Sequence, residues 1–217
     1  MILHTNNQID ISPDLALQLL KDGNERFCNN LRFNHNYLQQ VKVTASRQSP
    51  YAAVLSCMDS WAPVELILDQ GIGAIFSIRI AGNVISDNIL GSLEYAVAVG
   101  RSKLVVVMGH SNCGAIKGAC DNIKIGKLTT LLHQIKMAVL KEHHLLENND
   151  GSDPDFIRKI TVLNVYNSIT QILRQSRIIK QAFDFGQIML VPALYDVATG
   201  KVDFMPLKDA YKHEEYR

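Results

Sequence analysis

The sequence carries almost no excess of either charge. Its 217 residues contain 22 Lys and Arg against 21 Asp and Glu, which leaves a formal net charge of +1. A protein that binds nucleic acid neutralises many phosphates with clustered cationic side chains. The even balance therefore argues against nucleic acid as a partner.

Long apolar runs are missing as well. The most apolar stretches, such as Leu104 to Met108, are far shorter than the ~20 residues needed to cross a bilayer. Residues 1–13 mix polar side chains with single apolar ones, and they lack the cationic start and apolar segment of a secretory signal. We expect a cytoplasmic protein without membrane contact.

Cysteine is sparse, which excludes a scaffold built on disulfides. Four cysteines in a chain of this size, without a secretory signal, are better interpreted as reduced thiols that are available as metal ligands. Two of them, Cys28 and Cys120, fall outside the motifs described below, and we expect ordinary buried or partly buried thiols there. The other two are Cys57 and Cys113.

Apolar residues are plentiful: 47% of the chain is hydrophobic and only 20% is charged, enough for the core of one domain. Short apolar segments rich in β-branched residues alternate with helical patterns, which predicts right-handed crossovers between parallel strands. We therefore expect one α/β domain with a mostly parallel central sheet flanked by helices and an antiparallel C-terminal edge strand. The predicted strands are 51–56, 74–78, 103–108, 187–194 and 201–204, and the predicted helices are 13–27, 64–69, 89–99, 116–123, 128–146 and 155–173.

Residues 1–50 are predicted to form an N-terminal helical arm on an α/β core of residues 51–217. Ser12 is a plausible helix cap, and Pro13 suits the first helical position. The stretch 29–50 is polar, with little periodicity. We expect it to be irregular and either to cross the surface or to reach toward another subunit.

Potential metal ligands follow two of the predicted strands. Cys57 and Asp59 come after the strand 51–56, and His110 and Cys113 come after the strand 103–108. Parallel sheets bind ligands beyond the carboxyl ends of their strands, at the point where neighbouring connections diverge. Two thiolates and an imidazole suit Zn²⁺ and leave a fourth position open. Either fragment alone is more often structural, because a lone cysteine is usually a small buried residue.

These residues resemble the β-class carbonic anhydrases over nearly the whole chain. The C-x-D-S-R signature of that family appears as Cys57-Met58-Asp59-Ser60-Trp61, and its second motif as His110-Ser111-Asn112-Cys113-Gly114-Ala115. Further similar segments are 23–27, 69–73, 79–83, 91–95 and 195–200.

The resemblance implies a zinc enzyme that interconverts carbon dioxide and bicarbonate. Cys57, His110 and Cys113 would hold the zinc, and Asp59 would orient the hydroxide formed from water. Arg79 and Gly114 are the predicted substrate-binding residues. A structural interpretation is equally consistent with the sequence: residues 79–83 as a strand end with a tight turn at Gly82, and Gly114 as a site of close backbone packing. A homodimer or homotetramer is implied, with N-terminal helices that embrace a partner.

Trp61 departs from the family pattern, which has arginine there. An arginine pairs with the carboxylate that matches Asp59, whereas an indole offers one uncharged N–H. Asp59 then either coordinates zinc as the fourth ligand or is held away by another donor, for which Arg79 is a candidate. We favour the first arrangement, which implies low or pH-dependent activity.

Two alternative functions follow from the same residues. One is a zinc-binding family member with little or no hydration activity, which acts through binding or assembly. The other is a hydrolase of carbonyl sulfide or carbon disulfide, as occurs among relatives in the family. His133, His143 and His144 are weaker candidates for proton carriers, because their polar helical surroundings predict a solvated helix face.

Overall fold

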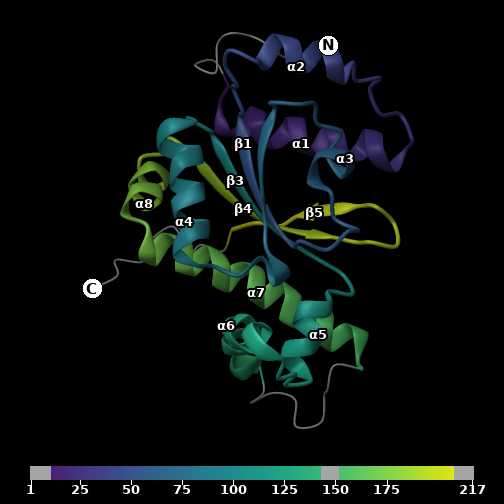
Figure 1. Cartoon of the computed structure of the whole chain (residues 1–217), viewed down its shortest axis with the longest axis vertical. Helices are drawn as coiled ribbons and strands as arrows, with labels where there is room; N and C mark the ends of the chain where they lie inside the picture. The colour runs from purple at the N-terminus through teal and green to yellow at the C-terminus, as the bar shows by residue number, and fades with distance from the viewer. Residues whose placement is uncertain (1–10, 143–151, 208–217) are drawn as a thin grey trace.

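A five-stranded sheet forms the centre of the molecule. The structure, a computed structural model, describes residues 11–142 and 152–207, with the side chains of 137–142 left aside. The strand order is β2-β1-β3-β4-β5, and only the last pair is antiparallel (Figure 1). The predicted mostly parallel sheet with an antiparallel C-terminal edge is confirmed. The strands are β1 (Ala52–Ser56), β2 (Ile75–Arg79), β3 (Leu104–His110), β4 (Met189–Tyr195) and β5 (Val202–Phe204).

Helices cover both faces of this sheet, because successive residues of its central strands point to opposite sides. Leu55 and Val107 belong to a core on one face, whereas Val54 and Val106 belong to a core on the other. All four side chains are fully buried, which explains why these strands read as continuous apolar runs. The first face is covered by α4 (Asp87–Glu94), α7 (Pro154–Gln175) and α8 (Arg177–Asp184), and the second by α1 (Pro13–Cys28) and α3 (Val64–Ile67).

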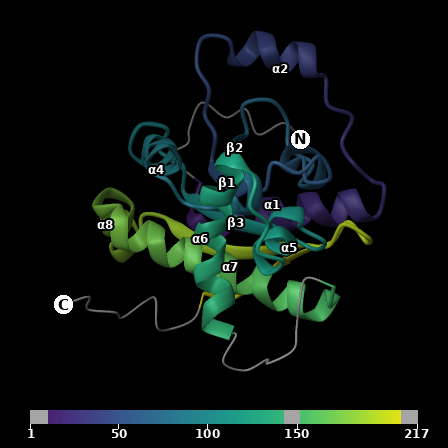
Figure 2. The same cartoon turned by 60° about the horizontal axis from the view of Figure 1, so that its bottom comes forward.

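A third core lies at the carboxyl ends of the parallel strands. There α5 (Gly114–Cys120) and α6 (Gly126–Glu142) pack against each other and against α7, as Figure 2 shows from below. Ile116, Ile135 and Ile160 are fully buried in this core. Cys57 and Cys113 belong to the same cluster, so two of the predicted ligands pack among apolar side chains.

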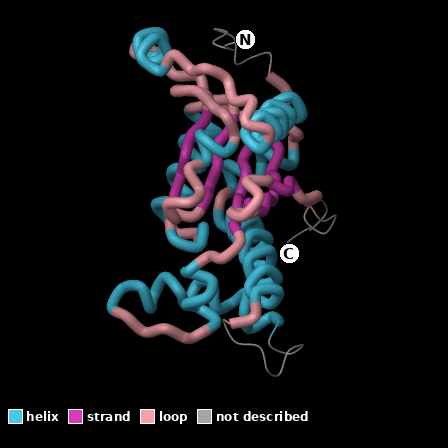
Figure 3. The backbone as a smooth tube through the Cα atoms, turned by 90° about the vertical axis from the view of Figure 1, so that its right-hand side faces the viewer, coloured by secondary structure: helices cyan, strands magenta, loops and turns pink. Residues whose placement is uncertain are grey.

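The stretch 29–50, which is predicted to be irregular, contains a helix, and that prediction is wrong. The helix α2 (Tyr37–Thr44) begins after Asn36, whose side chain accepts a hydrogen bond from the Gln39 N–H. Gln40 is its one buried residue, and α2 stands at the top of Figure 3, apart from the strands. Since its apolar side chains face outward, the helix has no buried apolar stripe that a sequence pattern could reveal.

Other elements also differ from the predictions. The predicted helix 89–99 changes to π-type turns at Tyr95–Val99 after α4. The helix α8 is not predicted, because it is short and buries only Ile179 and Ala182. Cys28 is exposed, contrary to the prediction of a buried or partly buried thiol, whereas Cys120 is partly buried as expected. Part of the predicted helix 128–146, including His143 and His144, lies outside the described residues.

No helix within residues 11–142 or 152–207 is long and apolar enough to cross a membrane.

Candidate metal centre

Cys57, His110 and Cys113 come together at the carboxyl ends of two adjacent strands. Cys57 directly follows β1, His110 is the last residue of β3, and Cys113 directly precedes α5. The chain leaves β1 toward β2 on one side and leaves β3 toward β4 on the other, so the three residues lie where these connections diverge, the usual place for a ligand site in a parallel sheet. The three ligand atoms lie within 4.8 Å of one another. The structure thus gathers the predicted set at the predicted place.

The geometry of this group suits a zinc ion. The Cys57 and Cys113 sulfurs are 3.9 Å apart. In a tetrahedral site with Zn–S bonds of about 2.3 Å, two sulfurs lie about 3.8 Å apart. All three residues are buried. A buried polar atom without a partner is costly, so a cation bound to all three would stabilise their burial.

His110 presents its Nε2 atom to the two sulfurs. Its Nδ1 atom lies 2.8 Å from the carbonyl oxygen of Ser111. Because a carbonyl oxygen can only accept a hydrogen bond, Nδ1 carries the proton in the neutral ring and Nε2 keeps its lone pair. Nε2 is buried without a hydrogen-bond partner among the described residues. This orphaned acceptor is the observation that fits a metal best.

The two thiols form one hydrogen-bonded pair. A hydrogen bond from Cys113 lowers the pKa of Cys57 to about 4, against the effect of burial, and the same hydrogen bond raises the pKa of Cys113. Burial lowers the pKa of His110, but the negative charge of the adjacent Cys57 sulfur outweighs burial and the net shift is upward. A bound cation would take the place of the proton in the hydrogen bond between the two sulfurs.

A short loop after β2 supports the sulfur of Cys57. The Gly82 N–H lies 3.4 Å from that sulfur and donates to it. Gly82 has φ +62, where a side chain would be strained, and a Cβ built on it would lie 2.6 Å from the Cδ1 atom of Ile135. From α7, Asn164 donates to the Gly82 oxygen and Ser168 to the Asn83 oxygen.

Sequence reasoning predicted the tight turn at Gly82 but missed Asn164 and Ser168. The signal that points to them is their spacing of four residues on α7. They are polar positions inside the buried stripe of that helix, where an unpaired polar group would be costly.

Asp59 lies beside the ligand group and not within it. Its Oδ2 atom is 4.0 Å from Nε2 of His110, and its Oδ1 atom accepts a hydrogen bond of 3.2 Å from the Trp61 N–H. The carboxylate therefore has one oxygen tied to the main chain and one near the centre. The Trp61 side chain is 52% exposed, so the indole fills no crevice in the described chain.

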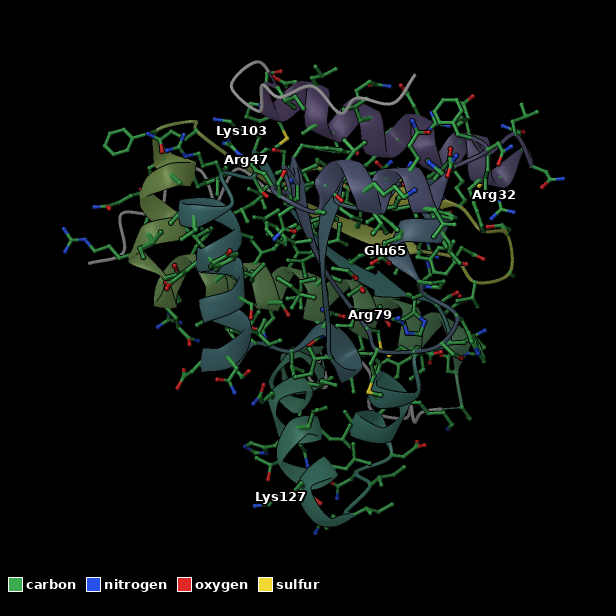
Figure 4. All side chains as sticks on the ribbon, turned by 45° about the horizontal axis from the view of Figure 1, so that its top comes forward. Arg32, Arg47, Glu65, Arg79, Lys103 and Lys127 are labelled. Atoms are coloured by element: carbon green, nitrogen blue, oxygen red, sulfur yellow. The ribbon has the colours of Figure 1, made fainter. Side chains whose placement is uncertain are left out.

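Arg79, the last residue of β2, reaches the same loop (Figure 4). Its Nε atom donates to the Cys57 oxygen over 3.1 Å, and Nη2 donates to the main-chain oxygen of Asp59. Among the described residues, its hydrogen bonds go to these two oxygens and not to the Asp59 carboxylate. Gly114 begins α5, and a Cβ there would meet nothing within 4 Å, so the expectation of close packing at Gly114 is wrong. His133 is exposed on α6, as predicted for a solvated face.

Comparison with known proteins points to one group. The chain matches the family model described as carbonic anhydrase over residues 52–202. A carbonic anhydrase of Mycolicibacterium smegmatis is 31% identical over 194 residues, 88% of this chain and 93% of that protein. One from Candida albicans is 28% identical and covers 98% of this chain and 80% of that protein. A structure reported among tetrameric β-carbonic anhydrases of Sordaria macrospora aligns at 25% identity with a TM-score of 0.71, over 89% of this chain and 95% of that one.

Proposed function

Because this chain belongs to the β-carbonic anhydrase family, we propose that it binds one zinc ion through Cys57, His110 and Cys113 and interconverts carbon dioxide and bicarbonate. The observation that carries the proposal is the buried group of three ligand atoms within 4.8 Å of one another, with an unpartnered Nε2 on His110. This donor set matches the preference of zinc for sulfur and nitrogen.

The reaction needs a hydroxide nucleophile near neutral pH. A zinc ion in this group would supply it by lowering the pKa of a water molecule to about 7. The residues of this chain exclude bulk water on the protein side, since Cys57, His110 and Cys113 are all buried. The Oδ2 atom of Asp59, which lies beside the ligand group, would accept a hydrogen bond from the hydroxide and so orient it for attack on carbon dioxide.

Carbon dioxide has to approach on the side of the ligand group that the protein leaves open. We propose that Gly114 contributes there, because it is exposed at the start of α5 and a Cβ built on it would meet nothing within 4 Å. The reverse reaction would use the same residues, with bicarbonate bound where carbon dioxide and hydroxide react in the forward direction.

A second candidate function is zinc binding without appreciable hydration. The observation that favours it is the position of Asp59, whose Oδ2 atom lies 4.0 Å from Nε2 of His110. Ligand atoms around a tetrahedral zinc lie about 3.3–3.8 Å apart, so a small movement would make Asp59 the fourth ligand. The site would then be closed to water, as structural zinc sites are.

Stopped-flow hydration of carbon dioxide by the zinc-loaded protein, measured across pH, separates the two functions. The lyase shows turnover that rises with pH as the nucleophile ionises, and Asp59→Asn lowers it strongly while zinc content stays constant. Background rates in the parent and the Asp59→Asn variant alike, with one zinc per chain, would establish the closed site and overturn the lyase.

We also propose that the protein is a homodimer or homotetramer. Large apolar side chains of α2 and the segment before it are exposed in the single chain: Leu38 is 78% exposed and Leu31 69%. Several large apolar side chains exposed on one segment favour an interaction surface there. A second copy of this chain would cover it by closed two-fold symmetry, the commonest arrangement in homo-oligomers. One structural relative is described as tetrameric.

A further inference from the structure

The Arg79 side chain forms hydrogen bonds with the loop that carries both Cys57 and Asp59. In the sheet Arg79 stands opposite Ser56, the residue directly before Cys57. From this place the guanidinium donates to the main-chain oxygens of Cys57 and Asp59. Its two bonds thus reach the residues on either side of Met58, and one of those residues supplies a sulfur to the ligand group.

The two bonds restrict the backbone between them. A guanidinium is a rigid planar fork that stays charged at every accessible pH, so its donors keep a fixed separation. Each bond fixes the peptide plane that follows the residue whose oxygen accepts it. With both planes fixed, the backbone dihedral angles of Met58 and Asp59 have little freedom, and so does the direction of the Asp59 side chain.

The rest of the Asp59 placement comes from the main chain as well. The Trp61 N–H holds Oδ1, and the exposed Trp61 side chain takes no part in that bond. The Gly82 N–H donates a hydrogen bond to the Cys57 sulfur. The loop is therefore oriented by one cation and two backbone amides.

We propose that Arg79 is a positioning residue, which sets the geometry of the metal centre by holding the main chain of the Cys57–Trp61 loop. This differs from the substrate contact predicted from the sequence, and it rests on the proposed zinc site. Without the guanidinium the Cys57 sulfur and the Asp59 carboxylate gain freedom, so the ligand group loses preorganisation for the metal. A substrate contact would instead leave the metal affinity intact.

The test compares the full-length parent with Arg79→Gln and Arg79→Lys, and with Arg47→Gln as a matched control. Arg47 is an exposed arginine that follows α2 and has no part in the ligand group. Circular dichroism and melting curves verify the fold of each variant. The readouts are the Co²⁺ ligand-field and thiolate charge-transfer spectrum, zinc affinity by chelator competition, and kcat and KM for hydration.

Arg79→Gln should weaken zinc binding about tenfold, the effect of losing roughly one charge-assisted hydrogen bond, and should alter the Co²⁺ spectrum. Arg79→Lys should recover part of the zinc affinity, because an ammonium group can donate to one of the two oxygens but cannot reproduce the paired donors of the guanidinium. Arg47→Gln should behave as the parent. If Arg79→Gln kept the parental spectrum and zinc affinity, whether or not KM rose, the positioning role would be wrong. If the parent itself bound neither metal, the proposed function would fail first.

Discussion

Replacing Trp61 with arginine should raise carbon dioxide hydration near neutral pH. In the parent chain the Asp59 carboxylate is held by a single neutral donor, the Trp61 N–H at 3.2 Å. Its free oxygen lies 4.0 Å from Nε2 of His110, where a zinc ion would attract it. An arginine at this position offers the carboxylate a charged, bidentate partner away from the metal.

The size of the effect follows from the two kinds of hydrogen bond. A neutral hydrogen bond contributes about 0.5–1.5 kcal/mol and one to a charged group about 1.5–3 kcal/mol. The difference of about 1–2 kcal/mol shifts the balance between blocked and open sites about 5–30-fold. Because the Trp61 side chain is 52% exposed, its replacement leaves no core cavity, and the fold should tolerate it.

The assay is stopped-flow hydration of parent and Trp61→Arg, with zinc content and fold verified in both. Trp61→Gln is the matched control, since it removes the indole without adding charge and should show no comparable gain. Combining Trp61→Arg with Asp59→Asn should abolish the gain, because the carboxylate is the partner of the new arginine. Rapid turnover by the parent at neutral pH, together with no gain in Trp61→Arg, would refute this reasoning.

Two further predictions concern the fold and the assembly. Gly82→Ala should lower the free energy of unfolding by roughly 1–3 kcal/mol, because it adds a Cβ at positive φ that would lie 2.6 Å from Ile135. Gly114→Ala is the control: its Cβ would meet nothing within 4 Å, so its free energy of unfolding should stay within about 0.5 kcal/mol of the parent in the same thermal melts. Leu38→Glu should shift the mass measured by light scattering toward the 24.2 kDa monomer, whereas Lys42→Glu on the same helix should not. A parent protein that is monomeric at micromolar concentrations would contradict the N-terminal arm as an interface.

The ligand group could be predicted because its position depends on simple rules. Cys57 directly follows one apolar strand and His110 ends another, and parallel strands bring their carboxyl ends to one edge of the sheet. Cys113 comes three residues after His110, so one loop carries both. The alternation of short apolar segments with amphipathic helical patterns also predicted the mostly parallel sheet. These inferences need local patterns and strand direction, which a single sequence contains.

The contacts that orient the site could not be predicted in the same way. Arg79 was assigned to substrate or to the Asp59 carboxylate, whereas the structure directs its guanidinium to two main-chain oxygens. Such targets depend on the distance between neighbouring strands and on the path of the loop. Asn164 supports the Gly82 loop from a helix 82 positions away in sequence. Contacts between distant segments leave no periodic signal.

Zinc content is the most direct test of the central claim, that Cys57, His110 and Cys113 hold one metal ion. Metal analysis of the purified parent should find about one zinc per chain, and Cys57→Ala combined with Cys113→Ala should lose it, because one imidazole alone cannot retain the ion. A parent with far less than one zinc per chain, or a double variant that keeps its zinc, would contradict the ligand assignment.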